Sequence, residues 1–241
     1  MTRALCIWLP DWPLQRLRVA RPELEHAALV LFAPRGRRGQ VVSACAPEAH
    51  EHGVFPGLPL AEAQTLLQHT TEREWRFEPA DPDADLIALR ALAGMCQTFG
   101  SLVALETDSP PSSLLIDVSG CASHFGGERG LLRAVTEEFS GLGLNIRTAL
   151  AESFGGAWGV AHFGAVGVQP SGCRENGVIV PRGRLREALH PLPLAALRLP
   201  AKVIQAFAEL DVLSVVQLER IPRDSLVARF GNEVLLRIDQ A

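Results

Sequence analysis

The sequence has no hydrophobic run of the length that a membrane helix needs. Its 241 residues are 47% hydrophobic and 21% charged, which is typical of a globular protein. No apolar stretch reaches the roughly 18 residues that cross a bilayer. The N-terminal segment meets Pro10 and Asp11 too early to form the core of a signal peptide. We therefore expect a cytoplasmic protein.

Paired cysteine motifs are missing as well. The five cysteines are odd in number and include no Cys-x-x-Cys pair, which argues against a disulfide framework. The nearest metal-like group is Cys121 and His124, with Cys45, His50 and His52 upstream. Zinc is held by four ligands at recognisable spacing. The sequence therefore predicts reduced thiols and no metal site.

Positive charge and phosphate-binding loops are also scarce. The net charge is −4, and Lys202 is the only lysine, whereas strong non-specific DNA binding depends on a concentrated positive field. The glycine-rich stretches 155–159 and 164–167 fit neither Gly-x-Gly-x-x-Gly nor a phosphate loop with its lysine. We expect them to allow close packing of a helix against a sheet.

Hydrophobic periodicity predicts an α+β protein whose texture changes near residues 185–190. Before that point strands and helices alternate, and after about Pro191 only short helices follow. Asp11 and Asp81 are expected to cap the helices that follow them. Strands are expected at 4–9, 27–32, 40–43, 102–107, 114–118, 145–151 and 178–180, and helices at 46–52, 60–68, 83–99, 128–142, 154–163, 201–210, 214–220, 222–229 and 232–239.

Four stretches resemble the Y-family DNA polymerases of the DinB/UmuC type, in the order and at the distances of that family. A fifth, the opening Cys6–Leu14, resembles the ImuB branch of the family, which is regarded as polymerase-like but inactive. The resemblance extends over nearly the whole chain. The four stretches are Val41–Ala49, Gly53–Ala63, Leu115–Gly120 and Pro222–Gly231.

The resemblance implies a Y-family polymerase core with a mixed-sheet palm, small fingers and an all-α, helix-hairpin-helix-like thumb. We assign 1–30 and 76–190 to the palm, 31–75 to the fingers and 191–241 to the thumb. The little-finger domain of the family, and the tail that recruits the sliding clamp, are expected to be absent because 241 residues cannot hold them.

The family's three metal-binding carboxylates are replaced when its motifs are laid on this sequence. The first carboxylate falls on Trp8, and the Asp-Glu pair falls on Ser112 and Ser113. Magnesium prefers charged oxygen ligands, which an indole lacks and neutral hydroxyls supply poorly. The resemblance therefore implies that no catalytic residue, metal or cofactor site remains.

The family's phosphate-binding residues are replaced in the same way. Its Tyr-x-x-Arg triphosphate clamp falls on Pro47 and His50, and its palm lysine falls on or near Gly159. In the thumb, the Pro-Gly-x-Gly hairpin that holds DNA falls on Leu197–Pro200. Pro200 has no N–H to offer a phosphate, so DNA binding is expected to be weak, with Arg198 as partial compensation.

The resemblance implies a non-catalytic scaffold of a damage-induced translesion complex, associated with the nucleoid. Its partners would be DNA, a RecA-like accessory protein of the ImuA type, an error-prone replicative-type polymerase and, through a region absent here, the sliding clamp. Two alternatives stay open. One is an active translesion polymerase with a displaced metal site at Asp11, Asp108 and Asp117, and the other is a partner-binding module that never touches DNA. Trp12 is the aromatic residue expected to be exposed as a contact.

Overall fold

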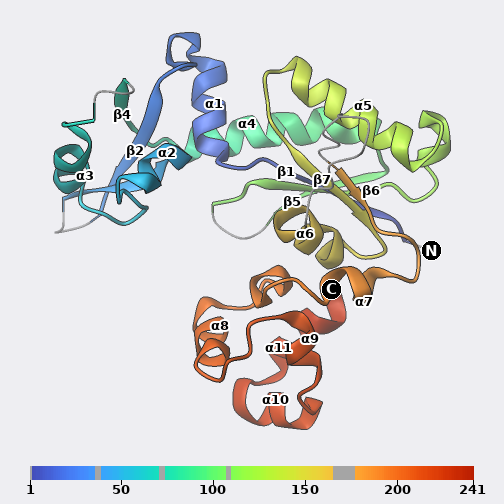
Figure 1. Ribbon diagram of the computed structural model, residues 1–241. Helices are drawn as coiled ribbons and strands as arrows, with labels where there is room; N and C mark the ends of the chain where they lie inside the picture. The colour runs from blue at the N-terminus through green and yellow to red at the C-terminus, as the bar shows by residue number, and fades with distance from the viewer. Residues whose placement is uncertain (1, 36–38, 71–73, 107–109, 165–176) are drawn as a thin grey trace. The chain divides into compact units, whose positions relative to one another are not determined.

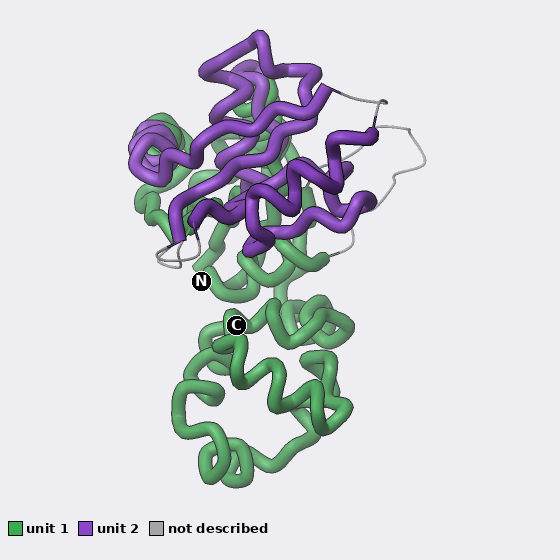
Figure 2. The backbone as a smooth tube through the Cα atoms, turned by 90° about the vertical axis from the view of Figure 1, so that its left-hand side faces the viewer, with its two compact units in different colours: residues 1–8, 92–140, 146–241 green, residues 9–91, 141–145 purple. Residues whose placement is uncertain are grey.

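The computed structural model describes residues 2–35, 39–70, 74–106, 110–164 and 177–241. The chain forms two compact units, coloured separately in Figure 2. Unit 1 comprises Met1–Trp8, Leu92–Ser140 and Ile146–Ala241, and unit 2 comprises Leu9–Ala91 and Gly141–Asn145. These units do not follow the predicted palm, fingers and thumb boundaries, which stay a prediction.

Unit 1 is built around a mixed sheet that has five strands in the described part of the chain, in the order β5-β6-β1-β7-β8. The β7 and β8 strands pair in parallel, and the other neighbours pair antiparallel. The predicted mixed sheet is thus confirmed. The strands are β1 (Ala4–Trp8), β5 (Leu102–Leu105), β6 (Ser113–Asp117), β7 (Arg147–Ala151) and β8 (Gly177–Ile179).

Helices lie on both faces of this sheet, with α6 (Phe154–Phe163) on one face and α5 (Glu128–Gly141) on the other (Figure 1). Strand β1 is buried on both sides, which explains its continuous apolar run. Because side chains alternate along a strand, Ala4 and Cys6 join the core beneath α6, whereas Leu5 and Ile7 point to the opposite face. Trp8, next in the alternation, lies on the α6 face.

The C-terminal part of unit 1, from α7 onward, contains helices and no strand among its described residues, as the sequence predicted. Its short helices pack around Phe207, Leu218, Leu226 and Val234. A capping box between Ser214 and Gln217 begins one of them. The elements are α7 (Leu185–Leu189), the 3₁₀ turn η5 (Leu194–Leu197), α8 (Ala201–Ala208), α9 (Val215–Glu219), α10 (Arg223–Phe230) and α11 (Asn232–Gln240).

Unit 2 contains a smaller sheet in the order β3-β2-β4. Strand β4 pairs in parallel with β2 and was not predicted: its Trp-Arg-Phe-Glu sequence alternates apolar and charged residues, but over only four residues before a proline. The elements are β2 (Ala28–Pro34), β3 (Gln40–Cys45), β4 (Trp75–Pro79), α1 (Trp12–Ala20), the 3₁₀ turn η1 (Pro22–Leu24), α2 (Pro47–Glu51), α3 (Leu60–Leu67) and most of α4 (Pro82–Met95).

Three predictions about individual side chains have different outcomes. Asp81 accepts the Ala84 N–H at 2.9 Å, so the predicted cap of α4 is confirmed. Asp11 was expected to cap α1 and does not: it adopts a left-handed conformation and makes no side-chain cap bond. Trp12 was expected to be exposed, but it is 3% exposed, and its indole N–H donates a hydrogen bond to the Asp85 carbonyl at 3.0 Å.

Among the described helices, none combines the length and the apolar composition that crossing a membrane requires.

Candidate functional site

Trp8 and Ser113, two of the positions singled out in the sequence, lie opposite each other on neighbouring strands. Trp8 ends β1 and is paired with Ser113, the first residue of β6, and on its other side with Arg147 of β7. Ser112 directly precedes β6. Ser113 is fully buried. The structure therefore brings the three predicted positions together at one end of the sheet.

The imidazole of His162 covers this strand end. The His162 Nε2 atom is hydrogen-bonded to the Ser113 hydroxyl at 2.8 Å. Its ring stacks on Trp8 with a centroid separation of 4.3 Å and on Trp158 with a separation of 4.0 Å. Trp158 and His162 are four residues apart in α6 and so share one helical face. Since two indoles cannot share one ring face, His162 is sandwiched between them.

Two guanidinium groups close the ends of this stack. The Arg147 Cζ atom lies 5.4 Å from the Trp8 ring centroid, and the Arg198 Cζ atom lies 5.4 Å from the Trp158 ring centroid. Both distances are within the range of cation–π attraction. Together the five side chains Arg147, Trp8, His162, Trp158 and Arg198 form what we call the aromatic column. It joins β7, β1, α6 and the residue after η5.

A buried carboxylate lies beside the aromatic column. Glu106 is 8% exposed, and its two oxygens accept different donors: the Trp158 indole N–H at 2.7 Å and the Ser112 backbone N–H at 3.2 Å. The nearby Cys6 is fully buried, and burial, followed by the negative charge of Glu106, raises the pKa of its thiol far above the usual range. Cys6 therefore remains a neutral thiol.

His162 remains neutral in the folded protein. Burial, reinforced by the positive charges of Arg147 and Arg198, lowers its pKa from 6.5 to about 3. A neutral imidazole can stack between two indoles without desolvating a charge. The column thus carries its positive charge only at its two arginine ends.

Acidification should therefore weaken the fold through His162. As the pH falls below about 6.5, His162 becomes protonated in the unfolded state. In the folded state it stays neutral until the pH approaches about 3. We expect the free energy of unfolding to drop by about 1–2 kcal/mol from this residue between pH 7 and pH 5, after allowing for the partial exposure of the ring. Urea unfolding at the two pH values measures the drop.

His162→Gln should remove that part of the pH dependence, whereas His26→Gln, at an exposed position, should leave it in place. An equal drop in the wild-type protein and in His162→Gln would show that the imidazole is not held neutral.

The residues at the strand end do not fit a divalent metal site. Magnesium is held by several oxygen ligands, mostly carboxylates, and the column offers indole, imidazole and guanidinium groups instead. Both oxygens of Glu106 already accept hydrogen bonds. In the described ranges, no group of three or more His, Cys, Asp or Glu side chains is arranged to hold a metal ion.

The three acidic residues of the alternative metal site are not seen to converge. Asp117 ends β6 opposite Ala4, four residues and about 13 Å along the strand from Ser113 at roughly 3.3 Å per residue. It accepts the Ser119 N–H at 2.9 Å, and its hydrogen bonds with Ser119 lower the pKa of its carboxyl group. Asp11 belongs to unit 2, and Asp108 lies outside the described residues.

Pro47 and His50, the predicted counterparts of the triphosphate clamp, both belong to α2 of unit 2. Pro47 begins the helix. His50 is exposed, and its ring stacks on the exposed Phe55 at a centroid separation of 4.9 Å. The His50 ring is thus stacked on Phe55. The arginine of the triphosphate clamp would instead offer a fork of N–H donors to a phosphate.

Gly159 allows α6 to approach the C-terminal helical elements. A Cβ atom at Gly159 would lie 2.7 Å from the Ala196 carbonyl oxygen, and one at Gly156 would lie 2.6 Å from Leu185. Close packing at these glycines was predicted, but the partner was wrong: it is η5 and α7, not the sheet. A lysine side chain has no room at Gly159.

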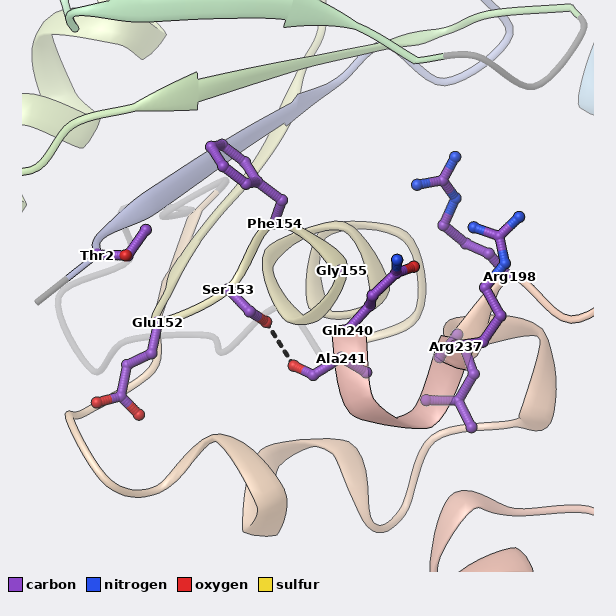
Figure 3. A pocket seen from close by; sticks show the side chains of 11 residues that line it. Thr2, Glu152, Ser153, Phe154, Gly155, Arg198, Arg237, Gln240 and Ala241 are labelled. Carbon is purple, nitrogen blue, oxygen red and sulfur yellow. Dashed lines mark hydrogen bonds between the residues drawn. The ribbon is translucent and has the colours of Figure 1, made fainter. Parts of the chain in front are cut away.

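A pocket of about 530 Å³ lies within unit 1, next to Arg198 (Figure 3). Ser153, at the start of α6, donates a hydrogen bond to the Ala241 carbonyl there. The side chains of Arg198 and Arg237 extend to the same side of the pocket (Figure 3). Arg198 thus lines the pocket and also lies over Trp158 in the column. Its backbone is left-handed (φ 55°), and Pro200, two residues later, directly precedes α8.

Sequence reasoning did not find the residues that complete this site. His162, Arg147 and Glu106 were not singled out, and Trp158 was expected only to be a core or interface aromatic. The spacing of Trp158 and His162 indicated a shared helical face, which is a local signal. Nothing in the sequence indicated that this face meets Trp8, because that contact joins residues about 150 positions apart.

No protein-family model matches this chain. Two groups of known proteins are similar to it, one by sequence and one by fold. The protein named ImuB, in two strains of Caulobacter vibrioides, is 33% identical over 189 residues, which cover 78% of this chain and 37% of that protein. The chain therefore spans little more than a third of the length of these curated relatives.

Solved structures of Y-family polymerases share the fold. An insertion ternary complex of Dbh DNA polymerase matches with a TM-score of 0.77 and 13% identity, over 99% of this chain and 67% of that one. The crystal structure of DinB from Sulfolobus solfataricus matches with a TM-score of 0.73 and 13% identity, over 99% of this chain and 66% of that one. At this identity the match establishes the fold alone.

Proposed function

This chain is an ImuB-type homologue of the Y-family DNA polymerases, and from that premise we propose that it acts as a non-catalytic, polymerase-like scaffold in damage-induced translesion synthesis. Its relatives by sequence and by fold are consistent with a role in that process. The step we add is that this chain supplies position and contacts, and another polymerase supplies the chemistry.

The observation that carries this proposal is the aromatic column. Nucleotidyl transfer with two metal ions depends on carboxylates that hold the ions beside the triphosphate. The positions aligned with those carboxylates carry Trp8, Ser112 and Ser113, and His162 is bonded to one of them and stacked on another. Apart from Glu106, whose two oxygens already accept hydrogen bonds, the described side chains of this strand end offer no negative charge to two dications.

Losses at the phosphate-binding positions support the same proposal independently. Gly159 has no space for a lysine, and His50 is engaged with Phe55. Metal ligands and phosphate-binding cations belong to different elements and would not be lost together by a single change. Retention of the polymerase fold without either set is what a scaffold would show.

The partners we propose follow the resemblance to ImuB proteins. They are an ImuA-type RecA-like protein, an error-prone replicative-type polymerase and a sliding clamp, the last bound through a region outside these 241 residues. We propose that this part of the protein contacts DNA only weakly, with Arg198 contributing, because the net charge is −4 and few phosphate contacts are available. The complex would operate in the cytoplasm at the nucleoid.

Primer extension by the full-length protein tests the proposal. We expect no nucleotide incorporation with Mg²⁺ or Mn²⁺ under conditions in which an active Y-family polymerase extends the same primer. The physical reason is that the ions have no carboxylate cluster to bind.

The opposite result would be incorporation that Asp11→Ala or Asp117→Ala abolishes and that Asp224→Ala, at an exposed position of α10, leaves unchanged. That pattern would establish the alternative, an active polymerase with a displaced metal site. Of its three residues, Asp117 is described within the same unit as Ser113 and lies at the other end of β6 from it.

A further inference from the structure

We propose that the aromatic column itself keeps divalent cations away from the strand end, so that restoring carboxylates at Trp8 and Ser113 would not restore metal binding while Arg147 and His162 remain. This inference rests on the proposed non-catalytic function and goes one step beyond it. The absence of carboxylates is then one cause of the missing metal binding. The second cause is that the side chains of the column occupy the strand end and exclude the ions.

The first argument is that each restored carboxylate would meet a ready partner inside the column. Trp8 is paired with Arg147 across β1 and β7, and the Arg147 guanidinium already lies over the Trp8 ring. An aspartate at position 8 would therefore form an ion pair with Arg147, the strongest kind of hydrogen-bonded pair for a carboxylate.

The same holds at position 113. The Ser113 hydroxyl is 2.8 Å from His162 Nε2, so a glutamate there would accept a hydrogen bond from the imidazole. A nearby negative charge also favours the protonated, cationic form of a histidine. His162 would then neutralise the new carboxylate that was meant for a metal ion.

The second argument is the balance of charge around the column. Among the described residues, the charged groups at the column are the guanidiniums of Arg147 and Arg198 and the carboxylate of Glu106. Two added carboxylates, with His162 protonated beside the new glutamate, would bring this excess of one positive charge to neutrality, not to the negative charge that two dications require. Two dications repel each other strongly where water does not separate them. A pair of them therefore requires the three carboxylates of the polymerase family.

The third argument is space. The His162 ring stacks on Trp8 and Trp158 at 4.3 Å and 4.0 Å, which is the separation of rings in contact. Between Ser113 and the imidazole there is only the length of a hydrogen bond. In the wild-type protein a metal ion with its water ligands cannot enter unless His162 leaves, and after Trp8→Asp the contacts of His162 with Ser113 and Trp158 remain.

This inference is tested by titrating the full-length protein with Mn²⁺ alone. Binding is measured as the decrease in the electron paramagnetic resonance signal of the free ion. We expect Trp8→Asp/Ser113→Glu to bind Mn²⁺ no better than the wild-type protein. Adding Arg147→Gln and His162→Ala to that pair should tighten binding at least tenfold. Arg147→Gln/His162→Ala alone, which empties the column without adding carboxylates, is the matched control and should bind as the wild type does.

Folding of each variant is checked by circular dichroism and thermal unfolding. If the fourfold variant does not fold, it is replaced by two variants that keep Trp8, namely Ser113→Glu and Ser113→Glu/His162→Ala. We expect the variant that lacks His162 to bind Mn²⁺ more tightly than Ser113→Glu alone.

Two results would overturn the inference: tighter Mn²⁺ binding by Trp8→Asp/Ser113→Glu than by the wild-type protein, or no further gain when Arg147→Gln and His162→Ala are added in a folded variant. Tight Mn²⁺ binding by the wild-type protein is a different result. It would contradict the proposed function itself.

Discussion

Gly159→Ala is expected to lower the free energy of unfolding by about 1–3 kcal/mol, the usual cost of forcing extra atoms into a packed interior. Alanine is the better helix former by about 1 kcal/mol, so the effect has the opposite sign to that of helix propensity. The cause is the Ala196 carbonyl oxygen, 2.7 Å from the position that a Cβ atom would take. That oxygen is backbone and cannot rotate away.

Gly94→Ala is the matched control for this prediction. Gly94 also lies in a helix, α4, but a Cβ atom there would meet nothing within 4 Å. We expect Gly94→Ala to be neutral or to stabilise by up to about 1 kcal/mol. Gly159→Lys, which introduces the residue type that the family resemblance predicts at or near this position, should cost more than Gly159→Ala.

Urea unfolding of the three variants measures these differences. If Gly159→Ala stabilises the protein as Gly94→Ala does, then α6 does not pack on η5 as closely as the structure has it, and Gly159 could accommodate the family's lysine after all.

Trp158→Phe is expected to lower the free energy of unfolding by about 2–3 kcal/mol. The phenyl ring keeps an aromatic face for His162 and Arg198 but removes the N–H that Glu106 accepts at 2.7 Å. A buried charged group that loses a hydrogen bond costs about 1.5–3 kcal/mol, and the smaller ring adds a packing loss. Chemical denaturation measures the change.

A double-mutant cycle with Glu106→Gln separates the hydrogen bond from the packing. The coupling should be about 1 kcal/mol or more, because a neutral amide forms a weaker bond to the indole than a carboxylate does.

Trp12→Phe is the control, since its indole N–H reaches only a neutral backbone carbonyl, that of Asp85. Its loss should be about 0.5–1.5 kcal/mol plus a similar packing change. Equal losses for the two tryptophans, together with no coupling in the cycle, would mean that Glu106 does not depend on Trp158.

Under the proposed non-catalytic function, the strand end at Trp8 and Ser113 is filled by other side chains and is not left empty. Here the place is filled by His162, bonded to Ser113 and held between two indoles. Selection acting on stability is free to pack such a site once catalysis no longer requires water and metal ions there.

Local features of the chain were determined by the sequence alone. The α+β class, the change to short helices near residue 190, and the cap of Asp81 on α4 all follow from periodicity and capping rules that operate within a few residues. The family resemblance also implied that Trp8, Ser112 and Ser113 belong to one site, through motifs that keep their order and distance. Each of these depends on neighbours in the chain or on a resemblance carried by short motifs.

Only the tertiary structure decided what those residues touch. Strand β4, the burial of Trp12 and the packing of Gly159 on η5 depend on partners far away in the sequence. The column does so most clearly, since it joins Trp8, Arg147, His162 and Arg198 from four separate segments. A sequence states which groups are available, but the contact energies that select among their partners exist only once the chain has brought them within a few ångströms of one another.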